Sequence, residues 1–109
     1  MTFPICVTVT IDRPMGSVHP NYPTIVYPVN YGYVAGVFGG DGEEQDAYIL
    51  GVDEPMVTFT GQLVAVIHRI DDNEDKWVVA PDGVVFTEAE IRRMTHFQEQ
   101  YFRTTIQMM

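Results

Sequence analysis

The chain has 109 residues, the size of one small domain, and we expect residues 1–109 to fold as a single unit. Hydrophobic residues make up 46% and aromatic residues 12%, which is too apolar for a disordered chain. Fifteen acids against six lysines and arginines give a formal charge of −9, so we expect no nucleic-acid or membrane partner. A protein of this charge either repels anions or meets them through bound metal cations.

Cysteine content and the apolar stretches bear on where the chain resides. Cys6 is the only cysteine, so an internal disulfide is excluded and a reducing cytoplasm is the expected location. Cys6 lies in an apolar segment, so we expect it in the core. Residues 14–40 carry no charged side chain, but prolines and glycines interrupt them, so they cannot form a membrane-spanning helix. No basic segment precedes an apolar stretch at the start, so no secretory signal is expected.

Short, β-branched segments dominate the first four fifths of the chain. The segments expected to form strands are 5–11, 23–29, 46–50, 57–60, 62–68 and 76–80. Turn-forming residues separate them, as at 39–42, 53–55 and 81–83. Short strands with such breaks favour a small antiparallel barrel over β-α-β units.

One helix is expected, and it begins at Thr87. Thr87 and Glu90 have the spacing of a capping box, in which each side chain accepts a hydrogen bond from a free backbone N–H. Apolar or amide residues then recur at helical spacing: Ile91, Met94, Phe97 or Gln98, and Tyr101. We therefore expect one face of this helix to pack on the barrel.

Ten of the fifteen acids lie in two short segments, residues 41–54 and 71–75. Two interpretations stay open: solvated acidic loops, or carboxylates that converge on hard cations such as Mg²⁺. The glycines around Asp41 allow a tight turn that would bring Asp41 back toward Asp46. Neither segment is an EF-hand, because its sixth position is Asp46 or Lys76 instead of glycine.

Other common chemistries have less support. Ser17, the only serine, lacks the context of a nucleophile elbow, and the histidines lack zinc-site spacing. No glycine-rich phosphate loop of the Walker type is present in the sequence. The acids are therefore the strongest chemical indication.

Four motifs follow one another along the chain. They are Ile11-Asp12-Arg13-Pro14-Met15-Gly16-Ser17, Tyr27-Pro28-Val29-Asn30-Tyr31-Gly32-Tyr33, Asp41-Gly42-Glu43-Glu44-Gln45-Asp46 and Asp71-Asp72-Asn73-Glu74-Asp75-Lys76. In this order they resemble the soluble inorganic pyrophosphatases of family I, with their E-I-P-x-G-S, YPxNYGY, D-G-D-P-x-D and third acidic segments. The helix end at 96–103 is similar to the family's tyrosine-containing helix, so the resemblance spans residues 5 to 103.

The resemblance implies a mainly β fold, namely a five-stranded, OB-like closed barrel with a C-terminal helix packed on it. It also implies hydrolysis of pyrophosphate to two phosphates with several Mg²⁺ ions, for which Mn²⁺ could substitute. Family members commonly assemble, so a homo-oligomer is among the implied states.

The resemblance also implies a role for particular side chains. The metal ligands would be Asp12, Asp41, Asp46, Asp71 and Glu74. Glu43 falls at the position of the general base, where a carboxylate can take a proton from a metal-activated water. Tyr31, Lys76 and Tyr101 fall at phosphate-contacting positions, with Tyr31 and Lys76 close enough to the reaction to count as catalytic.

The chain departs from the family in ways that keep alternatives open. It is shorter, and residues 16–27 leave no room for the hairpin that carries a lysine and an arginine to the substrate. His19 and Arg103 are the candidates to replace those cations. Glu43 and Glu74 stand where the family has aspartates. A related phosphohydrolase acting on a nucleotide or other diphosphate, and a non-catalytic barrel that binds metal or phosphate, therefore remain alternatives.

Overall fold

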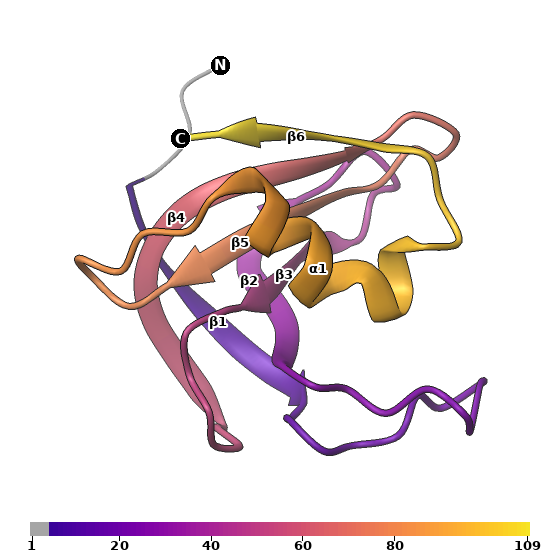
Figure 1. Cartoon of the computed structure of the whole chain (residues 1–109), viewed down its shortest axis with the longest axis horizontal. Helices are drawn as coiled ribbons and strands as arrows, with labels where there is room; N and C mark the ends of the chain where they lie inside the picture. The colour runs from indigo at the N-terminus through magenta and orange to yellow at the C-terminus, as the bar shows by residue number, and fades with distance from the viewer. Residues whose placement is uncertain (1–4) are drawn as a thin grey trace.

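The computed structural model describes residues 5–109, which contain six strands and one helix (Figure 1). In chain order these are β1 (Cys6–Arg13), β2 (Asn30–Phe38), β3 (Glu44–Ile49), β4 (Thr58–Arg69), β5 (Asp75–Ala80), α1 (Glu88–Glu99) and β6 (Thr104–Met108). The predicted mainly β chain with one C-terminal helix is confirmed.

Five of the strands close into a barrel. The order is β1-β2-β3-β5-β4, and the first half of β4 pairs back with β1. The second half of this 12-residue strand instead pairs with β6, which extends the sheet outside the barrel. All pairings are antiparallel except that of β3 with β5. The predicted five-stranded closed barrel is confirmed. It differs from the expected antiparallel barrel in one pair, because β3 and β5 run parallel.

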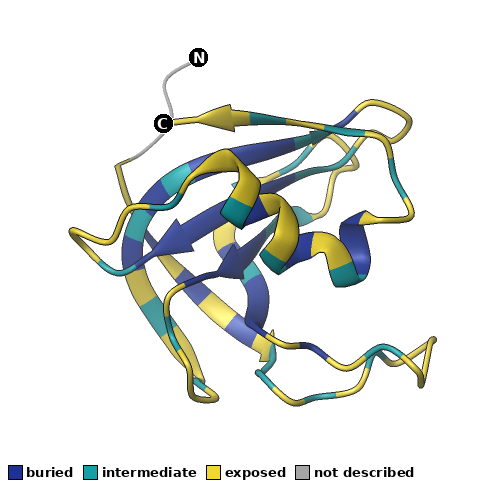
Figure 2. Cartoon of the chain, viewed as in Figure 1, coloured by how far each residue is buried: buried dark blue, intermediate teal, exposed yellow. Residues whose placement is uncertain are grey.

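The core has two parts, one inside the barrel and one beneath the helix. Alternate residues of β1, such as Val7 and Val9, point inward and join Val66 of β4 and Val79 of β5 in one cluster. On the outer face of the barrel, buried residues of β2, β3, β4 and β5 pack against Ile91 of α1. The adjacent strands β3 and β5 are therefore buried on both faces (Figure 2).

Helix α1 begins as its sequence predicts. Thr87 is the N-cap, and the capping box with Glu90 is present with hydrogen bonds of 3.1 and 2.9 Å. Ile91 is buried, but Tyr101 lies beyond the helix end and is 65% exposed, so its predicted packing on the barrel is wrong. Within residues 5–109, no helix has the length and apolar character needed to cross a bilayer.

Three other expectations from the sequence require correction. Residues 23–29 form no strand, because prolines in this region cannot donate to a ladder; a single bridge joins Val18 and Val26. Strand β2 begins only at Asn30, and neither β2 nor β6 was expected. Cys6 is exposed, because it lies on the outward-facing side of β1, so its predicted burial is wrong.

Candidate active site

A cavity of about 550 Å³ lies where the ends of several barrel strands meet the loop of residues 14–29 and the end of α1. This volume is typical of sites for small molecules. The residues that line the cavity are Asp12, Arg13, His19, Tyr22, Thr24, Ile25, Tyr31, Asp46, Arg69, Glu74, Lys76, Gln98, Tyr101 and Phe102. We call it the site pocket; it combines three acids, three permanent cations and several aromatic rings.

Lys76 is the central cation of the site pocket. Its side chain is 3% exposed, and its ammonium donates to Asp46 Oδ2 at 2.5 Å, to Tyr31 Oη at 3.0 Å and to Glu74 Oε2 at 3.2 Å. A buried ammonium is tolerated only with such partners, so these contacts fix its position. Burial, then the nearby Asp46 charge, holds the pKa of Tyr31 well above its usual range, so Tyr31 presents a neutral hydroxyl.

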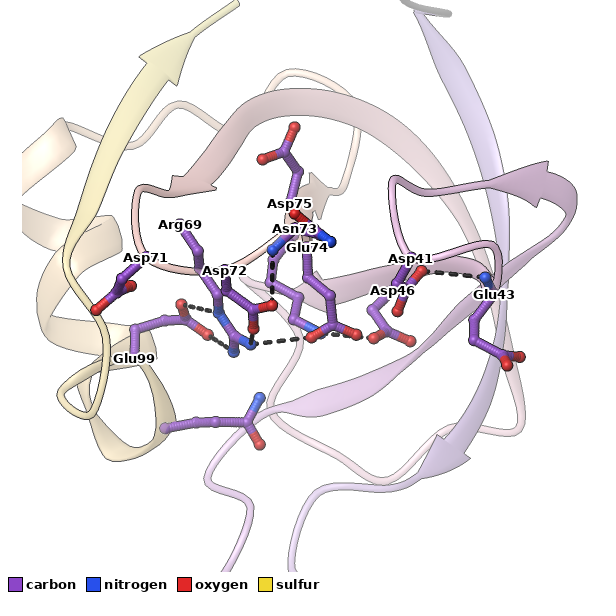
Figure 3. Close-up of polar contacts among 12 residues, drawn as sticks. Asp41, Glu43, Asp46, Arg69, Asp71, Asp72, Asn73, Glu74, Asp75 and Glu99 are labelled. Carbon is purple, nitrogen blue, oxygen red and sulfur yellow. Dashed lines mark hydrogen bonds and ion pairs between the residues drawn. The ribbon is translucent and has the colours of Figure 1, made fainter.

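Three carboxylates adjoin one another beside Lys76. Asp41, Asp46 and Glu74 point toward a common region in Figure 3. Hydrogen bonding to Glu74, and then to the Glu43 N–H, lowers the pKa of Asp41, whereas burial and then Asp41 raise the pKa of Glu74. This opposite movement is typical of carboxylates held close enough to compete for one proton or one cation.

Arg69, at the end of β4, connects this acid group to helix α1. Its side chain is 4% exposed and donates to Glu99 twice, at 3.0 and 2.7 Å, and to Glu74 at 3.0 Å. The Phe102 ring lies 3.6 Å from the guanidinium carbon. The Arg69 guanidinium is therefore fixed between Glu99 and Glu74, and its hydrogen bond holds the Glu74 carboxylate in position.

The hydrogen bonds continue from Glu99 across the floor of the site pocket. Tyr48 donates to Glu99 at 2.6 Å and accepts from Gln98 at 2.8 Å. Tyr27 donates to Gln98 at 2.8 Å and accepts from Arg13 at 2.7 Å. A continuous chain of hydrogen bonds thus runs from Asp46, through the residues beneath the pocket, to Arg13 on the other wall. Each buried polar group in this chain has a partner, which makes the pocket floor rigid.

The structure brings most of the predicted site residues to the pocket. Those that line it are Asp12, His19, Tyr31, Asp46, Glu74, Lys76 and Tyr101. Asp41 adjoins the pocket through Glu74. Burial raises the pKa of Asp12, opposed by Arg13. Burial, and then the Arg13 charge, lowers the pKa of His19, which makes this histidine a poor replacement for a permanent cation.

Besides Asp41, three predicted residues do not line the pocket. Glu43 is exposed and extends away from the other acids in Figure 3. Asp71 accepts the backbone N–H of Arg103 with both carboxylate oxygens, at 3.2 and 3.3 Å, and both residues are exposed. The roles implied for these three residues, like those implied for the residues that line the pocket, stay predictions.

The site residues predicted from the sequence do not include several polar residues of the pocket and its floor, among them Arg13, Arg69, Gln98 and Glu99. A usable signal existed for Arg69 and Glu99, because each places a charge directly after, or within, an apolar pattern. Arg13 follows Asp12 in the first motif, but nothing in one sequence shows which way it points.

The donor set suits a hard divalent cation. Asp41, Asp46 and Glu74 offer the carboxylate oxygens that Mg²⁺ prefers. Among residues 5–109, no three histidine, cysteine, aspartate or glutamate side chains are arranged to hold a metal together as they stand. Lys76 and Arg69 instead supply the positive charge near Asp46 and Glu74. The residues fit the ion in chemistry, and these two cations neutralise them in this arrangement.

The mainly β barrel gathers adjoining carboxylates, a buried lysine and a tyrosine hydroxyl at one pocket. The inorganic pyrophosphatase family model matches residues 9–107. The chain therefore belongs to the inorganic pyrophosphatase family, a family of hydrolases, and the resemblance seen in its motifs is confirmed.

Solved structures share the fold at low sequence identity. The inorganic pyrophosphatase from Ehrlichia chaffeensis aligns with a TM-score of 0.74 and 17% identity, over 99% of this chain and 88% of that one. The enzyme from Helicobacter pylori aligns with a TM-score of 0.65 and 17% identity over the same shares. The enzyme from Thermus thermophilus aligns with a TM-score of 0.63 and 16% identity, over 98% and 83%. No curated protein sequence matches the chain.

Proposed function

We propose that the chain hydrolyses inorganic pyrophosphate to two phosphates with Mg²⁺ as its cofactor, Mn²⁺ being able to substitute. The observation that carries this proposal is the group of adjoining carboxylates around buried Lys76 in a pocket of substrate size. The carboxylates themselves would repel pyrophosphate, so they need cations between them and the substrate.

Asp41, Asp46 and Glu74 would hold the cofactor, with Asp12 on the same pocket lining as a further ligand and Asp71 as the outer candidate. When bound, Mg²⁺ would polarise the phosphoryl oxygens and lower the pKa of a bound water. Burial raises the pKa of Glu74, so a neighbouring cation would favour the charged form of this carboxylate.

Lys76 and Tyr31 would bind and orient the phosphate groups. Lys76 offers a charge held in place by three contacts, and Tyr31 offers a neutral hydroxyl beside it. The three Lys76 donors are used in these contacts, so Lys76 would act through its charge and Tyr31 through its hydroxyl. Both groups are fixed before the substrate arrives and need no rearrangement as charge develops, which favours catalysis. Glu43 would accept the proton of the attacking water, and its backbone already bonds Asp41. Tyr101 and His19, on the pocket lining, and Arg103, beside Asp71, would add outer phosphate contacts.

One observation favours a second candidate, hydrolysis of a nucleotide or other organic diphosphate. His19 and Tyr22 form a ring pair with centroids 5.0 Å apart on the pocket lining, and exposed Tyr101 lines the same pocket. Aromatic faces of this kind can stack on an organic group attached to a diphosphate.

The location and assembly of the enzyme are part of the proposal. A cytoplasmic location is supported by the single cysteine, and the absence of a nucleic-acid or membrane partner by the net charge of −9. A homo-oligomer rests on the family resemblance alone.

Phosphate release from pyrophosphate by the purified chain tests the proposed function. We expect release that requires Mg²⁺ and stops when a chelator is added. Nucleoside diphosphates and triphosphates, assayed in parallel, distinguish the two candidates, because the second predicts a clear preference for one of them over pyrophosphate.

A further inference from the structure

Arg13 reaches the site pocket because β1 contains an irregularity next to it. The register of β1 with β2 runs from Ile11 opposite Gly32 to Arg13 opposite Tyr31, so Asp12 is an extra residue on one strand. Such a bulge turns the side chains that follow it and is common beside active sites. Here it places Asp12 and Arg13 together on the lining of the pocket.

The Arg13 guanidinium is supported on one side by tyrosine side chains and lines the site pocket on the other. One N–H donates to Tyr27 Oη at 2.7 Å, and Tyr27 is itself fixed by Gln98. The guanidinium carbon lies 5.7 Å from the ring centroids of both Tyr27 and Tyr31. A guanidinium has five N–H donors, and only this one has a hydrogen-bond partner within residues 5–109.

The other permanent cations of the pocket are already neutralised. Arg69 forms ion pairs with three acids and Lys76 with two. Arg13, in contrast, forms no ion pair with a carboxylate in the part of the chain that the structure describes, although Asp12 is adjacent in sequence. It is therefore the pocket cation that has no ion-pair partner among the described residues and keeps most of its N–H donors free for an incoming anion.

We propose that Arg13 is a substrate-binding residue that holds phosphoryl oxygens through its planar fork of N–H donors. This inference rests on the proposed function for the identity of the substrate. It also answers a question raised by the sequence, namely which residue replaces the cations of the missing hairpin. The geometry points to Arg13 in place of His19 or Arg103. A guanidinium fork matches phosphate geometry with two parallel hydrogen bonds, which an imidazole cannot provide.

The test compares Arg13→Gln with Arg93→Gln, which also removes one positive charge but from an exposed position on α1 outside the pocket. Binding of methylenediphosphonate, a pyrophosphate analogue that cannot be hydrolysed, is measured by calorimetry with Mg²⁺ present. We expect Arg13→Gln to weaken binding by roughly tenfold or more, the usual worth of a hydrogen bond between charged groups. Arg93→Gln should bind as the unaltered chain does. In turnover, KM for pyrophosphate should rise more than kcat falls.

Two further variants separate substrate binding from a structural role. Arg13→Lys keeps the charge but loses the fork, so it should bind more weakly than the unaltered chain. Tyr27→Phe removes the hydroxyl that supports Arg13 and should weaken binding less than Arg13→Gln does. The proposal is overturned if Arg13→Gln, or Arg13→Lys where the glutamine variant does not fold, binds the analogue as tightly as Arg93→Gln. It is also overturned if Tyr27→Phe reproduces the full loss, or if the unaltered chain does not bind the analogue.

Phosphate release tests the proposed function separately from the role of Arg13. If the unaltered chain binds the analogue but releases no phosphate from pyrophosphate, the hydrolytic activity fails. The calorimetric comparison of the Arg13 and Arg93 variants still decides the role of Arg13.

Discussion

Arg69 and Glu99 are joined by two parallel hydrogen bonds, Nε to Oε1 at 3.0 Å and Nη2 to Oε2 at 2.7 Å, although 30 residues separate them in sequence. Both side chains are almost fully buried, at 4% and 6% exposure. The same guanidinium also bonds Glu74 at 3.0 Å. This pair therefore ties helix α1 to the acidic wall of the site pocket.

Removing Arg69 should destabilise the whole fold. In Arg69→Met, Glu99 becomes a buried charge without its partner, which typically costs about 3–5 kcal/mol of unfolding free energy. Urea unfolding followed by circular dichroism measures this loss. The matched control is Arg92→Met, whose pair with Glu88 is exposed and should be worth roughly 0–1 kcal/mol.

A double variant shows whether the loss of unfolding free energy comes from the unpaired Glu99 carboxylate. Arg69→Met combined with Glu99→Gln removes both charges, so it should be clearly more stable than Arg69→Met alone. Equal unfolding midpoints for Arg69→Met and Arg92→Met would contradict the account of the pair.

Gly32→Ala should disrupt the pairing of β1 with β2. A Cβ at this position would lie 1.9 Å from the backbone oxygen of Thr10, so the two strands must separate locally. Crowding in a packed region costs typically about 1–3 kcal/mol, and a clash with backbone cannot be relieved by rotating a side chain. Urea unfolding of Gly32→Ala measures the loss. Ala35→Ser, at an exposed position on the same strand, should change stability by less than about 0.5 kcal/mol. A Gly32→Ala protein as stable as Ala35→Ser would refute the close approach.

The helix cap predicts a specific pH dependence. Hydrogen bonds from the Thr87 backbone, and then from its side chain, hold the pKa of Glu90 below the ordinary value of 4.5. The folded state therefore binds this proton less readily than the unfolded state. The stabilisation is fully present above pH 4.5 and is lost as the pH falls through the lower folded-state pKa.

Glu90→Gln should accordingly lose stability near neutral pH and show a weaker acid dependence below pH 4.5. Thermal unfolding between pH 7 and pH 3 measures both effects. Glu54→Gln, at an exposed loop position, serves as the control. If Glu90→Gln keeps the same acid dependence as Glu54→Gln, the cap does not contribute in this way.

The barrel and the start of the helix could be predicted because local signals determine them. β-branched alternation marks β1, and the capping box of Thr87 and Glu90 marks the start of α1. Strand β2 is not among the predicted strands because Gly32 and Gly36 lower its strand propensity. Gly32 is needed there because β1 approaches it too closely for a Cβ. The extended segment 23–29 looks like a strand by composition, yet its prolines remove the donors that a ladder requires.

The candidate site was only partly predictable. Asp46, Glu74 and Lys76 occupy positions in the sequence motifs, so the sequence could indicate them. In the structure, the Lys76 ammonium lies within hydrogen-bond distance of both carboxylates. A charge beside an apolar pattern marks Arg69 and Glu99 individually, but their pairing could not be predicted, because the pair forms only when α1 packs on the barrel. The direction of Arg13 depends on a bulge in the ladder, which has no signal of its own in one sequence.

The most direct test of the proposed activity is phosphate release from pyrophosphate at saturating Mg²⁺ by the unaltered chain, Asp46→Asn and Asp53→Asn. Asp53→Asn removes the same charge from an exposed turn outside the site pocket and should keep full activity. Asp46→Asn should lower kcat/KM on the order of 10²-fold or more, the usual effect of losing one preorganised electrostatic group. An unaltered chain that releases no phosphate, or an Asp46→Asn protein as active as Asp53→Asn, would contradict the account.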